Sequence, residues 1–178
     1  MVYATSDLVG SPSRFYDLLE QASETMPILG NVDESYLAFR SVDGLVFAID
    51  LFAAGFSTVW LDQAYWQRAI ASKPETSVRA YILGGIAWYG IPFGFATAMG
   101  LGCAALTSNE RFPTYPNPLS ATQNAAGLSS PATAITLLGQ GGAVLMLVLL
   151  FMAVTSSTSA ELIAVSSLLT FGKYQEVL

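Results

Sequence analysis

Three residues in the C-terminal part of the chain have the spacing of a small oxygen cluster. Ala153, Ser156 and Ser157 are three and four positions apart, so they share one face of a helix. On that face the two hydroxyls lie beside the backbone carbonyl of Ala153. Hard cations such as sodium prefer oxygen ligands, and a neutral set can hold a monovalent ion without trapping it. The alternative is that the hydroxyls bond to their own helix backbone or join neighbouring helices.

Two acidic residues, Asp50 and Glu161, lie in stretches that are otherwise apolar. A carboxylate facing lipid would cost roughly 2.5–3.5 kcal/mol on insertion scales, so we expect both to face protein, water or the membrane interface. Acids in such positions are candidates for carrying a proton or a coupling charge. For Glu161 the simpler alternative is that it reaches water or pairs with Lys173 near the end of its helix.

The sequence lacks the residues on which most enzymes and metal proteins depend. It contains no His and a single Cys, so nothing is available to activate the clustered serines as nucleophiles. We therefore expect no enzyme activity, no catalytic residue, no metal site and no cofactor. The formal net charge of −6, without a basic stripe, argues against nucleic acid as a partner.

Hydropathy predicts the elements that must position these residues. Hydrophobic residues make up 53% of the chain and charged residues only 11%, which favours a membrane protein over a soluble domain. A bilayer needs about 20 largely apolar residues per helix. Three stretches meet or approach this length, so we expect an all-α membrane protein with about three transmembrane helices, at residues 44–60, 80–106 and 143–171. In the second, Pro92 should kink the helix, and Gly90 and Gly94 should allow close helix contact.

Basic residues predict how these helices are oriented. Arg68, Lys73 and Arg79 lie between the first two stretches, and Lys173 follows the third. The positive-inside rule therefore places residues 61–79 in a cytoplasmic loop and residues 172–178 at a cytoplasmic end. Residues 1–43 then form an extracellular loop with a short amphipathic helix, for which Ser11 is the N-cap and Pro12 the first residue. Residues 107–142 form a second extracellular loop, also with a short helix.

Two segments resemble a known family of transporters. Residues 61–74 (LDQAYWQRAIASKP) are similar to the cytoplasmic signature that follows a core helix in sodium:solute symporters. Residues 151–170 (FMAVTSSTSAELIAVSSLLT) resemble the serine-rich eighth core helix of that superfamily. The amino-acid sequences of both segments, and of residues 80–101, are most similar to the urea active transporters of fungi and plants. The resemblance covers most of the chain from about residue 44 onward.

This resemblance implies a fold and a set of site residues. The fold would be part of the inverted-repeat core of the bacterial leucine transporter, and the chain would be a fragment that supplies only the sixth, seventh and eighth core helices. Ala153, Ser156 and Ser157 would match positions that line the shared sodium site. In the first helix, Gly55 stands where the family has an Asn that could hydrogen-bond a polar solute, and Thr58 remains as a hydroxyl in the solute path.

Two functions from different classes follow from these patterns. The first is part of a symporter, located in the plasma membrane as a multi-pass protein, that moves urea or a similar small polar solute with a cation gradient of sodium or protons. Its partners would be the solute, the lipid bilayer, and the missing transporter helices or another chain. The second is a truncated membrane protein, inactive in transport or serving as a partner subunit. A soluble helical domain is disfavoured because residues 80–106 have no polar face.

Overall fold

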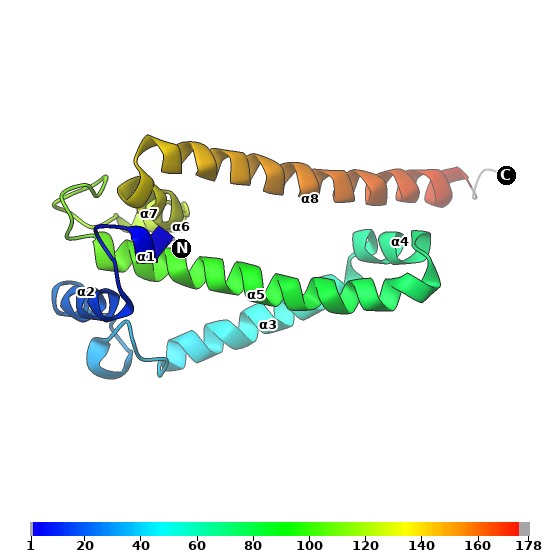
Figure 1. Cartoon of the computed structure of the whole chain (residues 1–178). Helices are drawn as coiled ribbons and strands as arrows, with labels where there is room; N and C mark the ends of the chain where they lie inside the picture. The colour runs from blue at the N-terminus through cyan, green and yellow to red at the C-terminus, as the bar shows by residue number, and fades with distance from the viewer. Residues whose placement is uncertain (1, 175–178) are drawn as a thin grey trace. The chain divides into compact units, whose positions relative to one another are not determined.

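The computed structural model describes residues 2–174, and every regular element among them is helical (Figure 1). This confirms the all-α prediction. In chain order the elements are α1 (Val2–Thr5), α2 (Pro12–Thr25), the 3-10 helix η1 (Val32–Glu34), α3 (Val42–Leu61), α4 (Gln63–Ala71), α5 (Pro74–Leu106), α6 (Ala121–Ala125), α7 (Ser129–Leu138) and α8 (Gln140–Tyr174).

Two helices, α5 and α8, are long and apolar enough to cross a membrane. Helix α3 passes the same test only together with α4, and the two are bent by 47° where they meet. The described residues thus contain two candidate spans, or three if the bent pair is one span, in agreement with the prediction of about three. In both long helices, none of the most apolar 18-residue window is buried. Apolar surface of this extent must be covered by lipid or by other protein, as in a membrane protein.

Local sequence explains where the shorter helices begin. Ser11 caps α2 by accepting a hydrogen bond from the Arg14 N–H at 3.2 Å, and Pro12 is its first residue, as predicted. The Asp62 carboxylate caps α4 by accepting from the Ala64 N–H at 2.8 Å. Residues 61–79, expected to form a loop, are therefore largely helical. Helix α6 begins with a capping box formed by Ser120 and Gln123.

The described residues fall into two compact units. The first contains residues 2–47 and 89–147, and the second contains residues 48–88 and 148–174. Each of the long helices α3, α5 and α8 therefore belongs to one unit at its start and to the other at its end.

The first unit has a small core around the C-terminal end of α5. Buried residues of the N-terminal segment, α5, the following loop and α7 meet there: Val9, Cys103, Leu106, Phe112 and Ala132. Two side chains fasten this end of α5 through its backbone. The Tyr3 hydroxyl donates to the Ala98 carbonyl at 2.6 Å, and the Thr133 hydroxyl donates to the Met99 carbonyl at 3.0 Å. Gly102 makes room for both, because a Cβ there would collide with the Tyr3 hydroxyl and the Thr133 methyl group.

The second unit is less densely packed. Among those of its residues whose burial is described, the buried ones are two small ones, Ala64 of α4 and Ala164 of α8. The Tyr81 hydroxyl, near the start of α5, donates to the Tyr65 carbonyl of α4 at 3.0 Å. This bond ties the first part of α5 to α4.

Candidate cation and solute site

The three residues of the predicted cation cluster lie on α8, which is helical without a break from Gln140 to Tyr174. Ala153, Ser156 and Ser157 therefore share one helical face within about one turn. All three are exposed in the described structure. The arrangement offers one carbonyl and two hydroxyl oxygens from a single helix, and any further ligands must come from other segments.

Three of the six other hydroxyls on this part of α8 are bonded to the helix backbone. Thr155 and Thr170 donate to the carbonyls four residues earlier, at 2.8 and 2.7 Å, and Ser166 donates to Ile163 at 3.0 Å. Within the described part of the chain, no such bond involves the hydroxyl of Ser156 or Ser157. Bonding to the helix backbone, the alternative role for these serines, is therefore seen in Thr155, Ser166 and Thr170 but not in the two candidates, nor in Thr158 and Ser159 beside them.

The face that carries the cluster continues toward the packed part of α8. Ala160, Ala164 and Ser167 follow Ala153 at intervals of seven, eleven and fourteen positions, so they lie on nearly the same side. Ala160 and Ser167 are half-buried, and Ala164 is only 5% exposed. The side of α8 that holds the two serines is thus the side that the second unit covers one to two turns further along.

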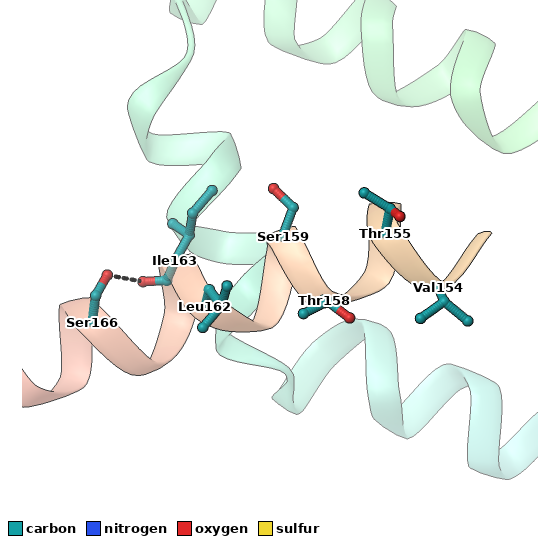
Figure 2. Close-up of a pocket in the computed structure, with 7 residues that line it drawn as sticks. All are labelled: Val154, Thr155, Thr158, Ser159, Leu162, Ile163 and Ser166. Carbon is teal, nitrogen blue, oxygen red and sulfur yellow. Dashed lines mark hydrogen bonds between the residues drawn. The ribbon is translucent and has the colours of Figure 1, made fainter. Parts of the chain in front are cut away.

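A second group of hydroxyls lies on the opposite side of α8, and the sequence analysis missed it. A pocket of about 570 Å³ lies there, and Figure 2 shows the α8 residues that line it, namely Val154, Thr155, Thr158, Ser159, Leu162, Ile163 and Ser166. None of the three predicted cation ligands is among them. The signal was present in the sequence, because the run TSSTS places hydroxyls on both sides of one helix. Neither side of α8 is therefore purely apolar at this level.

The two solute-path candidates lie on α3. Gly55 and Thr58 are both exposed, and a Cβ added at Gly55 would meet no atom within 4 Å. The Thr58 hydroxyl donates to the Ala54 carbonyl at 3.0 Å, which leaves its oxygen free to accept from a solute N–H group. Among the described contacts, none joins Gly55 or Thr58 to Ala153, Ser156 or Ser157.

The two acids differ in their position relative to the serine cluster. Asp50 of α3 and Glu161 of α8 are exposed, and neither forms an ion pair within the described residues. Lys173, the alternative partner of Glu161, has a side chain outside the described part of the structure. Helical geometry places Glu161 about 140° around the axis from Ser156 but only about 40° from Ser157, four positions earlier, so it shares the face of Ser157 and not that of Ser156.

The break between α3 and α4 is the other feature that sequence reasoning missed. It falls at Asp62, whose carboxylate is engaged as the cap of α4. Transporters place solute and ion sites at discontinuous membrane helices, because unwound backbone and helix ends supply polar groups there. Gly55 and Thr58 lie within two turns of this break. The signal in the sequence was the Asp-Gln pair directly after an apolar run.

Curated relatives match the chain over nearly its whole length. It is 46% identical over 175 residues to "Urea active transporter" of Saccharomyces cerevisiae, and 47% identical over 174 residues to "Probable urea active transporter 1" of Schizosaccharomyces pombe, covering 98% of this chain in both cases. It is 42% identical over 193 residues to "Urea-proton symporter DUR3" of Oryza sativa subsp. japonica, covering 100% of it. The chain spans about a quarter of the length of these relatives, 24–26%. No family model and no solved structure gives a match.

Proposed function

This chain is a homologue of the urea active transporters of fungi and plants, and from this premise we propose that it forms part of a secondary transporter that moves urea across the plasma membrane with a cation. The names of three relatives at 42–47% identity carry the proposal. The apolar surfaces of α5 and α8 support it, because they require a membrane or further helices around them.

In this proposal α8 supplies ligands for the coupling cation. Ala153 would offer its carbonyl, and Ser156 and Ser157 their hydroxyls. Two observations support the assignment: the side that carries the serines is the packed side of α8 further along, and neither hydroxyl is bonded to the helix backbone. Calcium, a hard cation of known ligand number, gathers roughly six to eight oxygens. Other helices of the transporter would supply the rest.

The coupling cation is either sodium or a proton, and the two make different demands. Sodium needs a shell of oxygens, for which the serine cluster is suited, whereas a proton needs a titratable group. Asp50 and Glu161 are the acids within the apolar stretches that could carry it. The rice relative is named a urea-proton symporter. With sodium as the cation the serine cluster would hold it, and with a proton one of these acids would carry it.

The solute path would run along α3 near its break. Urea has four N–H donors and one carbonyl acceptor, so a binding site needs neutral hydrogen-bonding groups in an otherwise apolar wall. Thr58 provides such a group, and Gly55 leaves open space beside it. This part of α3 is also where the helix is interrupted, four residues after Thr58.

A chimeric transporter tests the proposal. The matching segment of the Saccharomyces cerevisiae relative is replaced by this chain, and uptake of radiolabelled urea is measured in cells that lack their own transporter. We expect saturable uptake that depends on the cation gradient. The same chimera with its Thr58→Val substitution should show a higher KM for urea, and Thr155→Val, which removes a hydroxyl from the other helix, serves as the matched control. A chimera that reaches the cell surface but takes up no urea would contradict the proposal.

A further inference from the structure

Helix α5 lacks a backbone hydrogen bond near its middle, whereas both of its ends form contacts with other segments. Pro92 lies inside this 33-residue helix. Proline has no N–H group, so the carbonyl of Trp88 lacks the helical partner that residue 92 would normally provide, and the proline ring crowds that carbonyl. The boundary between the two compact units crosses α5 between Trp88 and Tyr89, at this same turn.

The two ends of α5 are held by different groups. Near its start, the Tyr81 hydroxyl binds the Tyr65 carbonyl at 3.0 Å. Near its end, Tyr3 and Thr133 bind the carbonyls of Ala98 and Met99, and Cys103 and Leu106 are buried in the core of the first unit. Between these points, residues 82–96 are exposed. The helix is therefore anchored in both units and unsupported in between.

Two glycines lie on the side of α5 opposite Pro92, where a bend at the proline would bring successive turns closer together. At 100° per residue, Gly90 and Gly94 are each about 160° around the helix axis from Pro92. A helix opens on the side of a proline and closes on the opposite side, so the glycines lie on the side where successive turns approach. A Cβ at either position would meet no atom within 4 Å as the helix stands. Their lack of a side chain is therefore not required by packing in this conformation.

We propose that the segment from Gly90 to Gly94 is a hinge in α5, at which the part before Trp88 and the part after Phe95 tilt against each other. Pro92 weakens one side of the helix and the two glycines allow the other side to close. The rings of Tyr89 and Phe93 stack across the hinge, with centroids 5.5 Å apart, and they cover one flank of the weakened turn. Hinge residues of this kind allow transporters and enzymes to alternate between states. Use of the hinge in transport rests on the proposed function, but its existence does not.

Solution NMR of the chain in detergent micelles tests the hinge without any transport assay. Residual dipolar couplings are measured for backbone amides of α5 before residue 88 and after residue 95. With the hinge, the two segments yield two different order tensors. In the variant Gly90→Ala/Pro92→Ala/Gly94→Ala the two tensors should merge into one. In this variant, the amide hydrogens of residues 92–96 should exchange slowly with solvent deuterium. Their exchange should be at least about fivefold slower than that of residues 93–96 in the parent, where Pro92 has no amide hydrogen, as expected for one regained hydrogen bond.

A matched control separates the hinge from a general effect of glycine. Gly84 and Gly85 lie on the same helix and also have nothing within 4 Å of an added Cβ. The variant Gly84→Ala/Gly85→Ala should keep two order tensors. A single tensor in the parent chain, or two tensors that persist after the three substitutions at the hinge, would overturn the proposal. Loss of urea uptake in the chimera would leave this result unaffected, so failure of the proposed function and failure of the hinge are distinguishable.

Discussion

The hydroxyl oxygens of Ser156 and Ser157 either bind the cation or only pack against neighbouring groups, and replacing each serine by alanine distinguishes the two roles. In the chimeric transporter, each Ser→Ala substitution should raise the cation concentration for half-maximal urea uptake about tenfold. A hydrogen bond to a charged group is worth roughly 1.5–3 kcal/mol, and a lost oxygen ligand should have an effect of that order. Thr155→Val removes a hydroxyl that is bonded to its own helix and is the control. Unchanged cation dependence in the double alanine variant would make the serines packing groups.

At Tyr3 one hydroxyl holds the N-terminal segment to α5. Tyr3→Phe should lower the free energy of unfolding of the first unit by about 1 kcal/mol, the typical value of one hydrogen bond. The variant keeps the ring contact with Phe15, whose centroid lies 5.5 Å away, so packing is retained. Denaturant titration of both proteins in the same detergent measures the difference. Equal midpoints would show that the bond contributes nothing.

The same tyrosine predicts a dependence on pH. Burial raises the pKa of Tyr3 above its ordinary value, and nearby Cys103 acts in the same direction. Because its pKa is higher in the folded than in the unfolded chain, docking of the segment is complete below about pH 10 and weakens as the pH rises through the raised value. Proteolysis of the N-terminal segment should therefore accelerate at strongly alkaline pH in the parent chain. Tyr3→Phe should show a smaller acceleration over the same range.

At the scale of elements, the joint between α7 and α8 depends on Gly142. A Cβ at this position would collide with the backbone carbonyl of Ala134, which cannot move aside as a flexible side chain could. Gly142→Ala should therefore destabilise the chain by about 1–3 kcal/mol, as measured by its midpoint of unfolding. Gly141→Ala, one residue earlier, meets nothing within 4 Å and should be close to neutral. Equal stability of the two variants would contradict the tight contact.

The sequence predicted those helices whose start or length depends on local residues alone. Ser11 and Pro12 identified the start of α2, and long apolar runs identified α5 and α8. Helix α4 was not predicted, because residues 61–79 were interpreted only for their side of the membrane; the Asp62 cap is the local signal for its start. The location of Ala153, Ser156 and Ser157 on one face followed from helical spacing. Which side of α8 is packed did not, since this depends on contacts with residues far away in sequence.

At the scale of the whole molecule, the orientation in the membrane remains a prediction. Residues 61–79 should be cytoplasmic and residues 107–142 extracellular, as the basic residues indicate. Single cysteines at Glu75 and Ala125, in a Cys103→Ser background, should react with an impermeant thiol reagent from opposite sides. Both positions are exposed, and neither cysteine replaces the Ser120 cap of α6. Reaction from the same side would refute the orientation.

The isolated chain should insert into a membrane but should not transport. Its serine cluster provides three oxygens, fewer than a hard cation gathers, and the exposed helices lack the partners that transporter cores provide. The purified chain is reconstituted in liposomes, and urea uptake is followed under a sodium or proton gradient. Saturable, gradient-dependent accumulation by this chain alone would overturn the prediction. Protease protection of the reconstituted chain confirms insertion independently.

The bond between Tyr3 and Ala98 also sets an order of events during synthesis. The two residues are 95 positions apart, and Thr133, which fastens the same turn of α5, is a further 34 positions from its partner Met99. During synthesis, the segment around Tyr3 must therefore wait until Thr133 has been made before its binding surface on α5 is complete. Closing so long a loop carries an entropic penalty that no local contact offsets. The N-terminal segment should consequently be the last part of the first unit to become protected during biogenesis, and the part on which a chaperone acts longest.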